Sequence, residues 1–136
     1  MSGEANLDRL LCSLEATLQD GLYVFVTLPG DQVPAGLAPR MMFHEAEGVT
    51  LILLREEAEA AGLAYEFPSR MITLDVHSSL DAVGFIARIA TELAKHGMGV
   101  NPVAGFHHDH LFVPDGREQE ALKVLAEIRA AASDPA

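Results

Sequence analysis

The sequence predicts an α+β fold in which antiparallel sheets carry helices on one face. Two observations support this prediction. Short runs of β-branched and aromatic residues alternate with segments whose apolar residues recur every three or four positions, the period of an amphipathic helix. From residue 70 onward the predicted order is strand, helix, strand, strand, helix, which is a ferredoxin-like split βαβ pattern that lacks only its last strand.

Composition limits the function classes. The chain of 136 residues is long enough for one ordinary domain or for two small units that share a core, and 49% of its residues are hydrophobic. A net charge of -11 repels nucleic acids and anionic lipid surfaces, so neither is expected as a partner. No apolar run is long enough to span a bilayer, residues 1–8 lack the pattern of a signal peptide, and Cys12 is the single cysteine. We therefore expect a cytoplasmic protein.

The N-terminal half contains one predicted helix and three predicted strands. Leucines at helical spacing over residues 7–18 predict a helix that ends near residues 20–21. Residues 22–28 are rich in β-branched and aromatic side chains and stop at a Pro-Gly pair, which predicts a buried strand. Residues 40–44 and 49–54 are two further strands, and the glycine in the short polar segment between them predicts an antiparallel hairpin.

The middle of the chain contains two predicted helices. Residues 55–61 are rich in Glu and Ala and predict a short helix before Gly62. A brief strand is expected at 64–67 and a longer one at 71–76. Residues 78–81 fit the Ser-x-x-Asp capping pattern, which predicts that a helix begins there and ends near residues 95–97.

The C-terminal segment completes the pattern with strands at 99–104 and 111–113 and a helix at 117–131. The chain supplies no later strand for the vacant position in this sheet. Residues 22–28 are apolar enough to occupy it, so the two halves are expected to interlace.

Residues 69–128 resemble an ACT domain, the small ligand-binding module of enzymes and regulators of amino-acid metabolism. The likeness is sharpest in Asp-Ala-Val-Gly-Phe-Ile at 81–86 and in Val-Asn-Pro-Val-Ala-Gly at 100–105. Four blocks in order are similar to a family of small bacterial tandem-ACT proteins of uncharacterised function, and this likeness covers about residues 7 to 130. The blocks are residues 45–53, residues 78–84, Asn101 and residues 108–114.

This resemblance implies two ACT units, an N-terminal one at 1–67 and a C-terminal one at 68–136. The implied architecture is related to the paired units of aspartokinases and of the mammalian arginine sensors, with a ligand between units and no chemistry of its own. We also expect a homodimer. The chain departs from the family in having no tryptophan, whereas an aromatic residue is expected near residues 70–72.

An amino-acid ligand presents a carboxylate and an ammonium group, and the predicted strand-to-helix corner has groups for both. Backbone amides of a first helical turn attract anions, Gly84 leaves the backbone accessible, and Asp81 is able to bind an ammonium group. The alternative interpretation is a capped helix whose glycine serves packing and whose aspartate complements the helix dipole. The candidate residues at this corner are His77, Ser78, Asp81, Ala82, Val83, Gly84 and Phe85.

Three later residues complete the candidate ligand site. Asn101 has an amide that both donates and accepts hydrogen bonds, although turn formation before Pro102 explains it equally well. By resemblance to the arginine-sensor type of ACT unit, Asp109 is the preferred partner of the ammonium group. His108 lies beside it.

The leading hypothesis is therefore a non-catalytic amino-acid-binding regulatory or sensor module that needs no cofactor. One alternative is a structural module that self-associates through its strand edges. A second is a metal-binding protein or metal-dependent enzyme that uses His108 and His110, which strand alternation places on one face while His107 and Asp109 take the other. Other catalysis has less support, because neither Cys12 nor Ser78 lies in a nucleophile motif.

Overall fold

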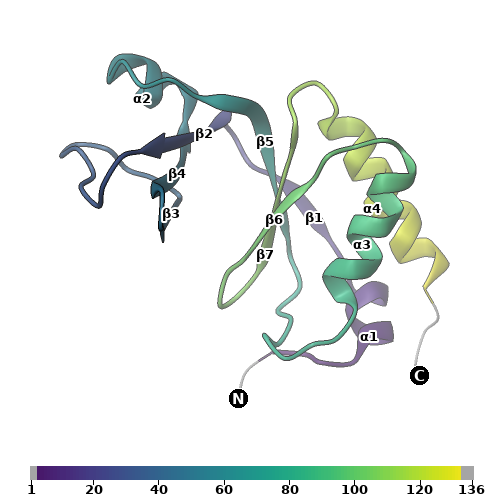
Figure 1. Ribbon diagram of the computed structural model, residues 1–136. Coiled ribbons are helices and arrows are strands. Elements are labelled where there is room, and N and C mark those ends of the chain that lie inside the picture. The colour runs from purple at the N-terminus through teal and green to yellow at the C-terminus, as the bar shows by residue number, and fades with distance from the viewer. Residues whose placement is uncertain (1–2, 133–136) are drawn as a thin grey trace. The chain divides into compact units, whose positions relative to one another are not determined.

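A computed structural model describes residues 3–132 of the chain. Within it the chain forms two compact units, one of residues 3–20 with residues 70–132 and one of residues 21–69 (Figure 1). Both are α+β units with antiparallel strand pairs, as predicted. Among the described residues, no helix combines the length and the apolar character that crossing a lipid bilayer requires.

The unit of residues 21–69 is built on the predicted hairpin. Strand β3 (Met41–Glu45) pairs antiparallel with β4 (Gly48–Leu54), and β4 pairs along its whole length with β2 (Tyr23–Leu28). Gly48 begins β4 with φ at 148°, and a Cβ atom there would lie 2.2 Å from the carbonyl oxygen of Leu28. Only glycine fits this close approach of two strands, so the turn residue predicted from sequence is required by packing.

A short helix covers one face of this sheet. Helix α2 (Arg55–Ala60) follows β4 directly, as predicted, and Gly62 comes soon after its end with φ at +68°. Alternate residues of β2 and β4 point toward it and form a small apolar core. The buried members of this core are Val24, Val26, Val49, Leu51, Leu53 and Ala58.

Strand β5 (Glu66–Leu74) is one strand where the sequence predicted two. Its first residues pair with β2, but Tyr23 faces Ser69 whereas Phe25 faces Glu66, so β5 has one extra residue between these pairs. Phe67 lies in this bulge with φ at +55°, and Pro68, which has no amide hydrogen to donate, follows it. The bulge lets a proline sit inside a continuous strand, and for this reason the predicted break at Pro68 was wrong.

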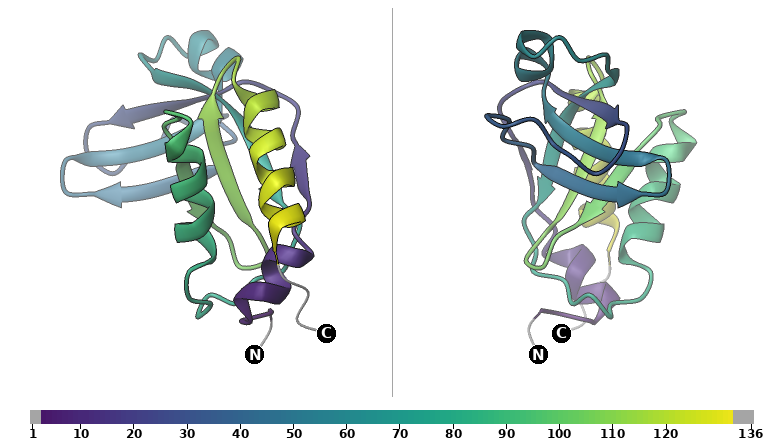
Figure 2. Two further views of the ribbon diagram at one scale, coloured as in Figure 1. Left: turned by 90° about the vertical axis from the view of Figure 1, so that its right-hand side faces the viewer. Right: turned by 60° about the vertical axis from the view of Figure 1, so that its left-hand side comes forward.

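The second unit contains the split βαβ pattern. Its sheet has the order β1 (Ala16–Leu18), the later residues of β5, β7 (Asp109–Pro114) and β6 (Asn101–Ala104). Helices α3 (Phe85–Lys95) and α4 (Glu118–Ala131) lie side by side on one face of it (Figure 2). Apolar side chains of these helices, the sheet and the N-terminal helix form the main core. Its buried members are Leu10, Leu11, Leu14, Ile72, Leu74, Phe85, Ile89, Leu93, Met98, Leu111, Val113, Ala121, Val124, Leu125 and Ile128.

The predicted helix over residues 7–18 is wrong in its second half. Helix α1 spans only Leu7–Cys12, and the chain then turns into β1, which pairs with residues 72–74 of β5. In β1 the half-buried Ala16 and Leu18 flank the exposed Thr17, which is the alternation of a strand. The vacant strand position beside residues 72–74 is therefore filled by β1, whereas residues 23–28 pair with β4 and with the start of β5.

We predict that Leu10→Ala lowers the free energy of unfolding by about 2–5 kcal/mol, because the Leu10 side chain is fully buried between α1 and the main core. Chemical denaturation measures this change. Leu80→Ala is the matched control, because Leu80 is 65% exposed and its truncation should change stability by less than about 0.5 kcal/mol. Equal effects of the two substitutions would show that α1 does not belong to this core.

Candidate functional site

The candidate corner is a loop rather than the start of a helix. Helix α3 begins at Phe85, seven residues after Ser78, and its N-cap is Gly84 with φ at 91° and no side-chain cap. The predicted Ser-x-x-Asp cap was therefore wrong: Asp81 is exposed in the loop, and the Ser79 hydroxyl accepts the amide hydrogen of Asp81 instead. A left-handed residue is needed to turn the chain into α3, which explains the glycine at position 84.

The protein uses most of the loop amides itself. The amide of Ser78 donates to the Val76 carbonyl at 3.0 Å, and that of Ala82 donates to the Ser79 carbonyl at 3.0 Å. The amide of Ser79 donates at 2.8 Å to Glu4, which in turn donates to the His77 carbonyl at 2.7 Å. These groups are not open to a ligand.

The backbone amides in the first turn of α3, by contrast, have no acceptor in the described part of the chain. The amides of residues 85–87 find no acceptor among residues 3–132. The side chains around them do not all face outward, because Phe85 is 3% exposed in the main core and Leu7 lies 3.5 Å from where a Cβ of Gly84 would be. Val83 is 83% exposed and Ala82 half-buried. Only the backbone of this turn, and not the Phe85 side chain, is available to an anion.

A buried hydrogen bond joins the loop to β7. The Ser78 hydroxyl donates to Oδ2 of Asp109 at 3.0 Å, and the two residues are 8% and 6% exposed. Asp109 is the first residue of β7, where it pairs with Ala104 of β6. A carboxylate accepts about four hydrogen bonds, but Asp109 receives no other from the described residues. A buried carboxylate with unused acceptor capacity is suited to an ammonium group.

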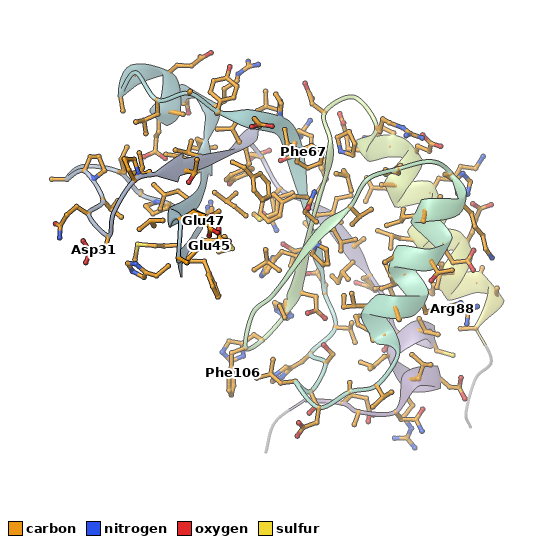
Figure 3. The ribbon with its side chains drawn as sticks, viewed as in Figure 1. Asp31, Glu45, Glu47, Phe67, Arg88 and Phe106 are labelled. Atoms are coloured by element: carbon orange, nitrogen blue, oxygen red, sulfur yellow. The ribbon has the colours of Figure 1, made fainter. Side chains whose placement is uncertain are left out.

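Three histidines and a phenylalanine form a ring cluster beside this pair. The His77 ring lies 5.3 Å from that of His107 and 6.5 Å from that of His108, and the Phe106 ring lies 5.2 Å from His107. Phe106 is 62% exposed at the end of the β6–β7 hairpin (Figure 3). Nε2 of His77 and Nδ1 of His108 are buried without any hydrogen-bond partner. Unsatisfied buried nitrogens are rare, so these two mark the cluster as a place where a polar partner is missing.

The remaining predicted residues lie elsewhere. Asn101 is exposed at the start of β6, opposite Phe112 of β7. His110 has its Nδ1 3.0 Å from the hydroxyl of Thr73, which also accepts a hydrogen bond from Gln19. Within the described part of the chain, no three His, Cys, Asp or Glu side chains are arranged to hold a metal ion.

Sequence reasoning missed Glu4 and Phe106. Glu4 forms a parallel bridge with Ser78, and nothing in the local sequence indicates a contact over that separation. A Cβ at Gly3 would lie 2.6 Å from the Ser79 amide nitrogen, so the glycine before Glu4 was a usable signal of close backbone approach. Phe106 had a signal as well, because it is a large apolar residue within a polar, histidine-rich hairpin.

We predict that Ser78→Ala lowers the free energy of unfolding by about 1–3 kcal/mol, because it leaves the buried Asp109 carboxylate without its donor. A double-mutant cycle measured by chemical denaturation tests this pair. In an Asp109→Ala background the same substitution should cost less than about 0.5 kcal/mol. Strict additivity of the two substitutions would contradict the hydrogen bond.

Comparisons with known proteins agree on the fold. A profile of the ACT domain matches residues 2–70, and a second ACT-domain profile matches residues 66–127. A crystal structure of a Vibrio cholerae protein of unknown function, described as a possible transport protein, is 42% identical, has a TM-score of 0.80, and covers 90% of this chain and 95% of its own. No curated protein matches the sequence.

More distant structures share the fold alone. An Agrobacterium tumefaciens protein is 16% identical with a TM-score of 0.74, covering 85% of this chain and 89% of its own. The regulatory subunit of aspartate kinase from Thermus flavus is 11% identical with a TM-score of 0.60, covering 83% of this chain and 95% of its own. Matches to both halves of the sequence and a relative of nearly equal length lead to one conclusion: the chain belongs to the ACT domain family and contains two ACT units in tandem.

Proposed function

We propose that this tandem ACT protein is a non-catalytic regulatory module that binds a free amino acid at the corner formed by His77, Ser78 and Asp109. ACT units are typically regulatory modules for small ligands, which supports the class of function. One observation carries the choice of site. A buried, under-used carboxylate and two buried imidazole nitrogens without a partner come from residues that adjoin in the chain, Asp109 next to His108 and Ser78 next to His77.

The proposed binding mode assigns the ligand's charges to these groups. The ammonium group binds Asp109, whose carboxylate has acceptor capacity to spare. The carboxylate of the ligand takes hydrogen bonds from an imidazole N–H and from the open first turn of α3, where the helix dipole is favourable. The exposed Leu80 and Val83 of the loop and Phe106 of the hairpin supply apolar surface for the ligand side chain.

Regulation requires that the ligand prefer one arrangement of the protein over another. The aspartate kinase regulatory subunit supports this role only through a shared fold. We place the protein in the cytoplasm as a homodimer, with a boundary between the units near residues 67 and 68. The two profile matches, which meet over residues 66–70, support that boundary, whereas residues 3–20, which precede it, belong to the compact unit of residues 70–132.

A second candidate is a self-association module without a small ligand. The same three exposed apolar residues favour it, because exposed apolar side chains contribute to protein interfaces. The two proposals differ in what Asp109 does, since a buried carboxylate at the corner contributes nothing to an apolar contact.

We predict that at least one of the twenty common amino acids binds the full chain in a calorimetric screen and raises its melting temperature. Asp109→Asn should weaken that binding at least about ten-fold, because it removes the charge that attracts the ammonium group. Asp115→Asn is the matched control, since Asp115 is exposed in the turn between β7 and α4. Binding by no amino acid, or equal binding by both variants, would refute the proposed site.

A further inference from the structure

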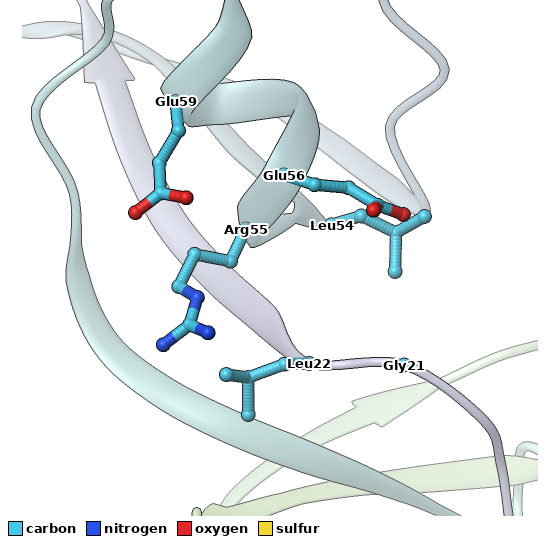
Figure 4. Close-up of a pocket in the computed structure, with 6 residues that line it drawn as sticks. All are labelled: Gly21, Leu22, Leu54, Arg55, Glu56 and Glu59. Atoms are coloured by element: carbon cyan, nitrogen blue, oxygen red, sulfur yellow. The ribbon is translucent and has the colours of Figure 1, made fainter.

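We propose a second ligand site, in the unit of residues 21–69, that takes a basic α-amino acid. It is a pocket of about 210 Å³ lined by Gly21, Leu22, Leu54, Arg55, Glu56 and Glu59 (Figure 4). This site does not depend on the function proposed above, because none of its residues belongs to the corner at Asp109.

The pocket forms where the chain enters β2 and leaves β4. Tyr23 of β2 pairs with Leu54 of β4, and the amide of Arg55 donates to the Leu22 carbonyl at 2.8 Å, so the walls are held by backbone hydrogen bonds. Gly21 has φ at +103°, and a Cβ there would lie 2.7 Å from Cδ2 of Leu54. A side chain at position 21 would therefore clash with Leu54 and displace it, so the glycine is needed for Leu54 to line the pocket as it does.

No direct ion pair joins the charged side chains around the pocket. Arg55 and Glu59 are four residues apart on α2, a spacing at which opposite charges commonly pair, yet no ion pair joins them. Among the described residues, the Arg55 guanidinium finds no carboxylate partner. Figure 4 shows the guanidinium above Leu22, with the Glu59 carboxylate on the same side of α2 and the Glu56 carboxylate beside Leu54.

A hydrogen bond from Tyr65 orients the Glu59 carboxylate. The hydroxyl of Tyr65 donates to Oε2 of Glu59 at 3.0 Å. This hydrogen bond, followed by burial and the charge of Glu59, raises the pKa of Tyr65 above its ordinary value. Glu59 therefore presents an oriented carboxylate at the pocket.

Charge complementarity selects the class of ligand. The pocket has one positive and two negative groups, so its complement has one carboxylate and two cationic groups. A basic α-amino acid has this set, and its aliphatic stem matches the apolar surface of Leu22 and Leu54. Because the three charged side chains are exposed, each contact contributes only a few-fold in affinity, and a dissociation constant of about 1 mM is expected at low ionic strength.

The test titrates L-lysine, cadaverine and L-norleucine into the full chain and follows backbone amides by NMR at low ionic strength. Cadaverine lacks the carboxylate of L-lysine, and L-norleucine lacks its side-chain ammonium group. L-lysine should shift the amides of residues 21–22 and 54–59 and should bind more tightly than either analogue.

Two charge substitutions and one control separate the contributions of Arg55 and Glu59 to ligand affinity. Arg55→Gln should weaken the binding of L-lysine about five-fold without weakening the binding of cadaverine, whereas Glu59→Gln should weaken the binding of both. Glu47→Gln, in the exposed turn between β3 and β4, should change neither. L-lysine binding that survives in Asp109→Asn separates this pocket from the corner site.

Three results would overturn the proposal. They are shifts spread over the acidic surface rather than confined to the pocket, unchanged L-lysine affinity in Arg55→Gln, and equal affinity for L-lysine and L-norleucine. Each variant is first checked for the wild-type pattern of amide dispersion, so a loss of affinity is read only from folded protein.

Discussion

The pairing of β1 with residues 72–74 of β5 is the constraint on which the C-terminal unit depends. Without it the split βαβ sheet would lack its fourth strand and would expose an edge. The pairing continues beyond the strand, because the Asp75 amide donates to the Glu15 carbonyl at 2.6 Å and the Thr17 hydroxyl donates to the Asp75 carboxylate. It also fixes α1 on the main core, so that the first residues of the chain reach the loop after β5.

This connection shapes the candidate corner. The Glu4 carbonyl accepts the Ser79 amide hydrogen and the Glu4 amide donates to the His77 carbonyl, so these two backbone groups of the loop are satisfied by the protein itself. Two sets of buried side-chain groups keep hydrogen-bonding capacity: the Asp109 carboxylate, and the imidazole nitrogens of His77 and His108. Because buried polar groups are normally paired, these groups define the region in which a ligand has most to contribute.

The sequence predicted the elements whose signals are local. The strand at β2, the β3–β4 hairpin with its glycine, the short α2 and the final α4 all follow from periodicity and turn chemistry, and the structure confirms them. The helix over residues 7–18 was wrong because pairing with β5, far along the chain, outweighs the helical spacing of leucines after Cys12. The predicted helix cap at Ser78 was wrong because the Ser78 hydroxyl, in the loop, donates its hydrogen bond to Asp109 of β7.

The candidate site was predictable only in part for the same reason. Asp109 and the loop after Val76 came from the resemblance to ACT units, and the structure joins them through a direct hydrogen bond. Neither the role of Glu4 nor the gathering of His77 with His107 and His108 follows from spacing, since both are tertiary contacts. Strand alternation separated His107 from His108, but the hairpin turn before β7 brings both rings to His77.

The central claim is that Asp109 receives the ammonium group of an amino acid. A crystal structure of the protein grown with a pool of the common amino acids tests this claim most directly. We expect density for one amino acid with its ammonium nitrogen within hydrogen-bond distance of the Asp109 carboxylate and its carboxylate directed toward the first turn of α3. A corner filled by the protein's own side chains, with the amino acid bound elsewhere or not at all, would contradict it.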